Sequence, residues 1–172
     1  DQNRCKHPMY PHAIHSSAKT KQRGVAVYLR RNFPLEITHT QIDKEGRFLI
    51  LVGKFETSMI TLATAYTPNS AQDTFLRRIL DVLGGVVQGE IALMGDFNSV
   101  HSPQLDREGD RPSSSPAFSR GLKSNLESLG LRNVWRSDHP TSPGYMFYSH
   151  VHRTHSCLNY ISISNITLPR VT

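Results

Sequence analysis

The chain has 172 residues, which is the size of one ordinary domain, and its formal net charge at pH 7 is +6. No apolar run approaches the ~18–20 residues of a membrane helix, and no signal-peptide core opens the chain. We therefore expect neither a membrane span nor secretion by a standard signal. Collagen and repeat architectures are excluded too, because the sequence has no glycine period and no self-similar unit of ~20–50 residues.

The positive charge is concentrated at the N-terminal end. Residues 1–31 carry seven Lys and Arg and a single Asp, whereas residues 32–172 hold 13 basic and 13 acidic side chains. A solvated basic arm and a phosphate-binding surface both fit this distribution, and the sequence leaves the two open. The two cysteines, Cys5 and Cys157, form no CxxC motif, which favours free thiols in an intracellular protein over a disulfide framework or a zinc ribbon.

The first third of the chain predicts strands. Residues 1–23 are polar and without period, so we expect an irregular, basic lead-in. Residues 24–30 predict a strand with Val25, Val27 and Leu29 on one face. Residues 47–53 form a nearly continuous apolar run, typical of a strand buried on both faces. Residues 58–66 are rich in β-branched side chains and predict a third strand.

A helix is predicted next. Residues 70–73 resemble a capping box, with Asp in place of the usual Glu. Phe75, Ile79 and Leu83 then recur at helical spacing. We expect the glycine pair 84–85 to end or kink this helix. A short buried strand over residues 91–94 follows.

The last third of the chain completes an α/β pattern. Residues 99–116 predict a long surface loop, because too little chain follows to build a second core. A helix is expected over residues 118–130, and strands over 145–149 and 158–163. Because helices alternate with buried strands, the sequence predicts a single α/β domain over residues 1–172.

Residues 95–98, Gly-Asp-Phe-Asn, are the sharpest candidate for chemistry. A buried strand that ends in glycine and then presents a carboxylate and an amide fits a site at the carboxyl end of a sheet. Asp96 has the chemistry of a base or a metal ligand, and Asn98 that of a donor to a phosphoryl oxygen. An Asx turn, in which both side chains bond local backbone, fits equally well.

Three other groups are weaker candidates when taken alone. Tyr66 ends a strand, where its phenol either bonds a phosphate or caps the core with its hydroxyl in water. Asp106 and Arg107 lie in the predicted loop, and an exposed ion pair is the alternative to a functional role for them. A cluster of histidines suggests a metal, but no carboxylate or Cys–His spacing supports zinc, so we assign no metal ligand there; its members are His150, His152 and His155.

Read in order, several segments carry a family resemblance. They cover residues 23–27, 43–48, 65–69, 95–98 with 105–107, 134–136 with 139–140, and 145–149 with 156–160. In this order and spacing they resemble the endonuclease domain of long interspersed element (LINE-type) retrotransposons, which belongs to the endonuclease/exonuclease/phosphatase superfamily. The resemblance runs from about residue 11 to residue 163, and its specificity lies in order and spacing rather than in any one motif.

The resemblance implies a fold and an activity. The expected fold is a four-layer α/β sandwich, in which two β-sheets face each other with helices outside, and this chain is expected to be incomplete at both ends. The expected activity is Mg²⁺-dependent hydrolysis of DNA phosphodiester bonds. The resemblance also implies DNA as partner, a nuclear location, and a longer polyprotein that carries a reverse transcriptase.

The resemblance assigns roles residue by residue. The aspartate matching Asp96 activates water, while the amide matching Asn98 and the tyrosine matching Tyr66 hold the scissile phosphate. Asn159 stands where the family has an aspartate that orients a histidine. Further substrate contacts are expected from the neighbouring matched segments, at Arg107, Ser149 and Ser156.

Several family features are missing from the sequence. The metal-binding glutamate and the closing Ser-Asp-His motif have no match at the expected places, so the Mg²⁺ site is expected to be incomplete. Asn159 can accept the histidine's hydrogen bond but cannot stabilise an imidazolium. Residues 137–139 spell Ser-Asp-His, yet they precede the Asn159 segment, where the family has a connecting loop, and we do not expect them to serve.

Three hypotheses remain from the sequence. The first is a divalent-metal-dependent DNA endonuclease domain, impaired in this chain. The second is an inactive retroelement remnant that at most binds nucleic acid non-specifically. The third, a phosphatase of small molecules, is disfavoured by the positive charge. If core strands are missing, we expect apolar faces such as Phe48, Ile50 and Val52, or Ile91 and Leu93, to be partly uncovered.

Overall fold

The computed structural model describes residues 8–19, 23–109 and 116–165. Three sheets and three helices occur among them. The strands are β1 (His12–Ser17), β2 (Gly24–Leu29), β3 (Leu35–Ile42), β4 (Phe48–Phe55), β5 (Ser58–Tyr66), β6 (Glu90–Asp96), β7 (Arg107–Glu108), β8 (Leu131–Asn133), β9 (Phe147–Ser149), β10 (Thr154–Ser156) and β11 (Asn159–Ser164). The helices are α1 (Gln72–Val86), α2 (Pro116–Ser128) and α3 (Val134–Asp138).

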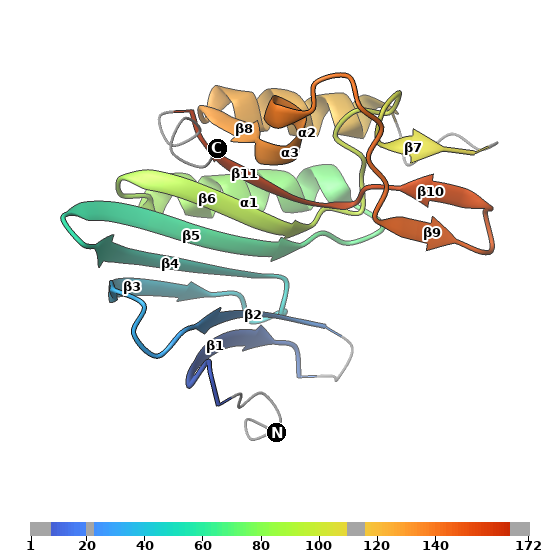
Figure 1. The fold of residues 1–172 in the computed structure, drawn as a ribbon. Coiled ribbons are helices and arrows are strands. Elements are labelled where there is room, and N and C mark those ends of the chain that lie inside the picture. Colours follow the sequence, from blue (N-terminus) through green and yellow to red (C-terminus); the bar gives the residue numbers. More distant parts are fainter. Residues whose placement is uncertain (1–7, 20–22, 110–115, 166–172) are drawn as a thin grey trace.

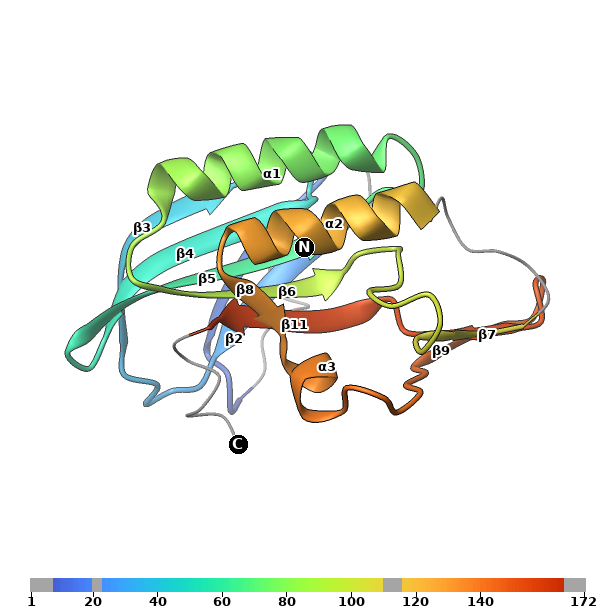
Figure 2. The same cartoon turned by 90° about the horizontal axis from the view of Figure 1, so that it is seen from above.

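A six-stranded sheet organises the molecule. Its strand order is β3-β4-β5-β6-β11-β8, and every pairing is antiparallel except the parallel pair β5–β6. Helices α1 and α2 cover one face of this sheet (Figure 2). A separate antiparallel pair, β1–β2, lies on the other side, and a small sheet of order β7-β10-β9 projects from one end (Figure 1). No helix of the described residues is long and apolar enough to cross a membrane.

The core explains why β4 reads as one apolar run. Phe48 and Ile50 point to the helical side, where the ring of Phe48 lies 6.5 Å from that of Phe75 on α1. Leu49 and Leu51 point to the opposite side and are just as deeply buried. A strand with both faces covered needs apolar side chains at every position, as the sequence predicted.

The predicted α/β sandwich of facing sheets flanked by helices is confirmed. The described residues supply its helical layer, its six-stranded sheet and a two-stranded piece of the second sheet. The expectation that parts of the core lie uncovered is wrong for Phe48, Ile50, Val52 and Leu93, each at most 2% exposed. Phe48, Ile50 and Leu93 are packed in the core beneath the two helices, and Ile91 is half-buried.

The start and end of α1 differ from the prediction. The capping box does not form, because Ala71 takes the N-cap position with φ 54° and no side chain caps the helix. Gly84 and Gly85 neither end nor kink it, and both lie inside α1. A Cβ at either glycine would meet open space, so the pair faces outward while Leu83 is buried and anchors the last turn.

Several short or polar strands were not predicted. Residues 1–23 were expected to be irregular, but they contain strand β1. This strand pairs with β2 along its whole length. Strand β3 was missed because it lies at the sheet edge with polar side chains on it. The predicted loop 99–116 contains β7, and β8, β10 and α3 are also additions. Residues 1–7, including Cys5, lie outside the described residues.

Candidate active site

Three of the predicted site residues form one row across the sheet. Tyr66 of β5 is in register with Asp96 of β6, and Asp96 is in register with Asn159 of β11. Their sequence neighbours Ala65 and Tyr160 belong to the core under the helices, so the row lies on the sheet face away from the helices. Adjacent strands are ~4.8 Å apart, so the row is about 10 Å across. We call Tyr66, Asp96 and Asn159 the site row.

Gly95 makes the row possible. Its φ is +148°, and a Cβ at this position would lie 1.9 Å from the carbonyl oxygen of Ala65. Only glycine allows β6 to approach β5 so closely just before Asp96. The glycine of the Gly-Asp-Phe-Asn motif is therefore explained by backbone packing, and it sets Asp96 beside Tyr66.

Asp96 and Asn98 form the local turn that the sequence left open. The backbone N–H of Asn98 donates to Oδ1 of Asp96 at 2.9 Å, and Asn98 has φ +46°. The side-chain amide of Asn98 donates to the carbonyl oxygen of Thr67, whose own N–H donates to the carbonyl of Asp96. Asn98 thus ties the ends of β5 and β6 together, next to the site row rather than within it.

Arg47 is a site residue that the sequence analysis missed. Its guanidinium carbon lies 5.1 Å from the centre of the Tyr66 ring, and Nη1 donates to the Tyr66 carbonyl oxygen at 3.3 Å. A cation over an aromatic face is electrostatically favoured. The Arg47 guanidinium also places positive charge at the Tyr66 end of the site row. The only signal in the sequence was that Arg47 lies within a segment carrying the family resemblance.

Asp106 does not form the exposed ion pair considered for residues 106–107. It is buried and pairs with Arg136 of α3, which is 12% exposed. Oδ2 of Asp106 accepts a hydrogen bond from the backbone N–H of Ser102 at 2.6 Å. The carbonyl oxygen of Asp106 accepts one from the backbone N–H of Cys157. Asp106 therefore fixes the loop after the Gly-Asp-Phe-Asn motif to α3 and to the segment that leads into β11.

The proposed substrate-binding residues lie on the small sheet. Arg107 of β7 is in register with Ser156 of β10, so these two come together. Nε of Arg107 is buried and has no hydrogen-bond partner among the described residues. Ser149 is in register with Thr154 instead, two residues along β10 from Ser156 and about 7 Å away. Its hydroxyl accepts the backbone N–H of His152.

Three of the histidines singled out in the sequence, His139, His150 and His155, pack against aromatic rings. His139 stacks on Trp135 with ring centres 3.7 Å apart, so the Ser-Asp-His at residues 137–139 belongs to α3 and its C-cap. It is not on a strand edge beside Asp96. On the small sheet, the ring of Tyr148 contacts both His150 and His155.

The donors present do not fit a divalent metal centre. No three His, Cys, Asp or Glu side chains gather in the described part of the chain in a way that could hold a metal ion. Asp96 is the one carboxylate of the site row, and the Asn98 N–H engages one of its oxygens. Mg²⁺ prefers one or two carboxylates together with phosphate and water. A metal here needs donors beyond those that the row supplies.

Burial changes the proton affinity of three groups near the row. Burial raises the pKa of Tyr160 well above 10, and Tyr160 stacks on Phe97. It also raises the pKa of the Cys157 thiol. Burial lowers the pKa of His101 below 6.5, against the opposing effect of Asp106. All three are therefore neutral at pH 7 and serve packing rather than charge.

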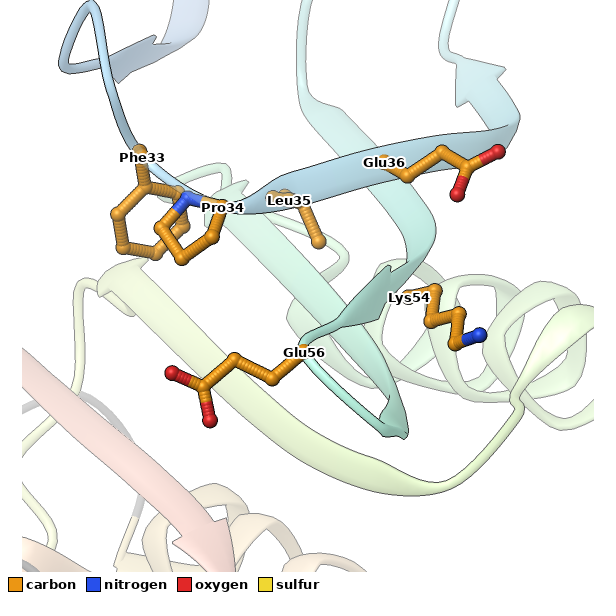
Figure 3. Close-up of a pocket in the computed structure, with 6 residues that line it drawn as sticks. All are labelled: Phe33, Pro34, Leu35, Glu36, Lys54 and Glu56. Carbon is orange, nitrogen blue, oxygen red and sulfur yellow. The ribbon is translucent and has the colours of Figure 1, made fainter.

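A hollow at the opposite end of the sheet is separate from the site row. It is lined by Phe33, Pro34, Leu35, Glu36, Lys54 and Glu56 (Figure 3). Lys54 lies near the end of β4 that pairs with the start of β5, whereas Tyr66 ends β5. The hollow therefore takes no part in the geometry of the row.

The chain belongs to the endonuclease/exonuclease/phosphatase family, whose model matches residues 1–170. The resemblance read from the sequence is thereby confirmed. The fold also matches the endonuclease domain of TRAS1, a telomere-specific non-LTR retrotransposon, with a TM-score of 0.64 and 15% identity over 92% of this chain and 68% of that one.

Two AP endonucleases share the fold as well. The enzyme LMAP from Leishmania major matches with a TM-score of 0.76 and 16% identity, over 94% of this chain and 64% of that one. An AP endonuclease from Archaeoglobus fulgidus matches with a TM-score of 0.64 and 19% identity, over 94% and 69%. This chain thus spans about two thirds of the length of the structures it matches.

Proposed function

We propose that this chain is the DNA-contacting part of a phosphodiesterase related to retrotransposon endonucleases. The observation that carries the proposal is the register that sets Asp96 between Tyr66 and Asn159. Nuclease neighbours and the family match support the same reading. In this proposal a DNA phosphate approaches the site row on the sheet face away from the helices.

The side chains of the row suit a phosphodiester. Tyr66 supplies a hydroxyl donor, and Arg47 beside it adds positive charge. Asp96 supplies a carboxylate that can take a proton from an attacking water. Arg107 adds a second guanidinium on the adjoining small sheet, next to Ser156. DNA, which offers a row of phosphates, fits the net charge of +6.

We further propose that hydrolysis is impaired in this chain. Asn159 occupies the position of a histidine-orienting aspartate, and an equivalent Asp-to-Asn change in a serine protease lowers kcat about 10⁴-fold. The row also lacks the donors for a divalent cation, as described above. At minimum, then, the chain acts as a salt-dependent, sequence-independent DNA binder, which is also what an inactive retroelement remnant would do. Membership of a reverse-transcriptase polyprotein and residence in the nucleus are part of this proposal.

One experiment separates binding from hydrolysis. The purified chain is mixed with supercoiled plasmid and millimolar Mg²⁺, and conversion to open circle is followed on gels. We expect no conversion, while anisotropy of a short labelled duplex reports binding that weakens as salt rises. Nicking that disappears in Asp96→Ala would refute the impairment. Absence of any DNA binding at low salt would refute the function itself.

Arg47 provides the test of where DNA binds. Arg47→Gln should weaken binding several-fold and lower the slope of log K against log salt by about 0.9, the value for one phosphate that is no longer neutralised. Arg77→Gln is the matched control, because Arg77 is an exposed residue of α1 on the opposite side of the sheet. Equal effects of both substitutions would mean that DNA does not lie along the site row.

A further inference from the structure

An apolar groove adjoins the site row at Asn159. It has a volume of about 700 Å³, within the range of ~300–1,000 Å³ that is typical of small-molecule pockets. Met94 of β6 and Ile161 of β11, which are directly opposite each other in the sheet, belong to its lining. Trp135 of α3 and Met146 line it as well. We call this cavity the open groove.

The open groove presents large apolar side chains to solvent. Ile161 is 49% exposed, whereas its neighbour Tyr160, which belongs to the core under the helices, is 6% exposed. Met146 and Trp135 are 70% and 45% exposed. Figure 2 shows α3, which carries Trp135, on the side of β11 away from α1 and α2. Large apolar side chains that are exposed together in one concavity mark a binding site.

Hydrogen bonds within the chain fix the wall of the open groove. Nη1 of Arg136 donates to the carbonyl oxygens of His139 and Ser142, at 2.8 and 2.7 Å. These two bonds hold the segment that connects α3 to Met146. The backbone N–H of Met146 donates in turn to the carbonyl oxygen of Ser156 at 3.0 Å. The shape of the groove therefore needs no ligand to form.

One carboxylate lies in this apolar lining. Asp138, the last residue of α3, is the only acidic side chain among the described residues of the groove, and no Lys, Arg or His lines it there. Within the part of the chain that the structure describes, Asp138 makes no ion pair and no side-chain hydrogen bond. Arg136, two residues earlier on α3, pairs with Asp106 instead. The open groove thus holds a negative charge that no basic side chain balances.

The lining selects a ligand by its charge. An anion, such as a phosphate of DNA, is repelled by Asp138. A neutral apolar ring covers the groove but removes water from the carboxylate and gives it no partner in return. A flat ring with one positive charge buries the apolar surface of Met94 and Ile161 and pairs with Asp138 as well. The indole of Trp135 adds an aromatic group that attracts cations.

We propose that the open groove binds a small aromatic amine in its cationic form, with the ring on Met94 and Ile161 and the ammonium group beside Asp138. Apolar burial provides most of the affinity, and the carboxylate provides the selectivity for charge. The site borders the site row at Asn159 but is separate from it, and the proposal does not rest on the proposed function.

Three probes of one shape test the selectivity for charge. Biphenylmethylamine, biphenylmethanol and biphenylcarboxylate are positive, neutral and negative at pH 7. Each is titrated into the 172-residue chain by calorimetry, and the emission of Trp135, the only tryptophan, reports binding at the groove. We expect the amine to bind about fivefold more tightly than the alcohol, the upper end for an exposed ion pair. The carboxylate should bind more weakly than the alcohol.

Two substitutions locate the probes. Asp138→Asn should remove the preference for the amine and leave the affinity for the alcohol unchanged. Asp81→Asn is the matched control and should keep the preference, since Asp81 is an exposed aspartate of α1. Ile161→Ser should weaken the amine and the alcohol alike, because both lose the same apolar contact. Met146→Ser on the wall is a second variant in case Ile161→Ser impairs folding.

Four outcomes would overturn the proposal. None of the three probes binds, or the amine and the alcohol bind the wild-type chain equally well. In the third outcome, Asp138→Asn and Asp81→Asn reduce the preference for the amine to the same extent. In the fourth, the chain self-associates in sedimentation experiments and Ile161→Ser abolishes this, which would make a second copy the occupant of the groove.

Discussion

Asp96 and Asn159 are directly opposite residues of the antiparallel pair β6–β11, at the point where β6 leaves the sheet. A carboxylate therefore faces an amide across the strand pair. Restoring a second carboxylate by Asn159→Asp should lower stability by roughly 0.2–1 kcal/mol, as like charges opposite each other do. Millimolar Mg²⁺ should raise the melting temperature of the variant and not that of the wild type, because two carboxylates suffice to attract the cation.

Calorimetry with and without Mg²⁺ checks this prediction. Asn159→Ser is the control, since it removes the amide without adding charge. A wild-type melting temperature that already rises with Mg²⁺ would show that the row and its surroundings bind the cation as they stand. An Asn159→Asp variant indifferent to Mg²⁺ would show that the two side chains do not converge.

The N-terminal basic side chains should carry much of the DNA affinity. Lys19, Arg30 and Arg31 are exposed residues of the described chain next to β1 and β2. Changing all three to Gln should lower the salt slope of DNA binding by up to about 2.7, at about 0.9 for each phosphate that is no longer neutralised. The control triple removes three exposed basic side chains from α1 and α2, at Arg77, Arg120 and Lys123. Equal slopes for the two triples in anisotropy titrations would contradict the prediction.

The buried pair of Asp106 and Arg136 should matter strongly for stability. Asp106→Ala leaves the Arg136 guanidinium, 12% exposed, without its carboxylate, which typically costs about 3–5 kcal/mol. Urea unfolding followed by circular dichroism gives the value. Lys123→Ala, which breaks an exposed pair with Glu127, should cost less than about 0.5 kcal/mol. Similar losses for both variants would mean that the buried pair contributes no more than a surface contact.

His101 should make the fold acid-sensitive. Burial lowers the pKa of His101 below 6.5, so the unfolded chain binds its proton at a higher pH than the folded chain does. Its contribution to stability is therefore intact above pH 6.5 and is lost as pH falls below that value. Asp106 and Glu127 oppose the effect of burial and raise the pKa of His101, whereas Lys123 and Arg136 lower it further.

Unfolding free energies measured across this pH range test the role of His101. His101→Gln should flatten the decline between pH 6.5 and 5, whatever its effect on absolute stability. His39→Gln on strand β3 is the control, since His39 is exposed. A slope that His101→Gln leaves unchanged would assign the acid sensitivity to other groups.

Strong local patterns in the sequence predicted the centre of the fold. The apolar run of β4 is a strand with both faces covered, and the β-branched run of β5 pairs with β4 along the whole length of β4. Strand β3 escaped prediction because it pairs on one side only and tolerates His39 and Thr40 in solvent. The Gly84–Gly85 pair misled because sheet packing at Leu83, not local propensity, holds the end of α1.

The site was predictable only in part for a related reason. The positions of Tyr66, Asp96 and Asn159 follow from strands that the sequence does predict. The partner of Asp106 does not, because Arg136 lies 30 residues away and only the tertiary fold joins them. Whether Asn98 bonds local backbone or points outward is likewise decided by the closeness of Thr67, which sequence spacing does not reveal.

The pairing of β6 with β11 also sets the order in which the molecule can assemble. During synthesis, β5, α1 and β6 form one local crossover unit, and β11 emerges about sixty residues after β6, so its docking closes a long loop at an entropic cost of about (3/2)RT ln n. β6 therefore has one unpaired edge until β11 has been synthesised. Asp96 is in place early, and Asn159 reaches it last. A ribosome stalled before residue 159 would hold a folded β4–β5–β6 core with no site row at all.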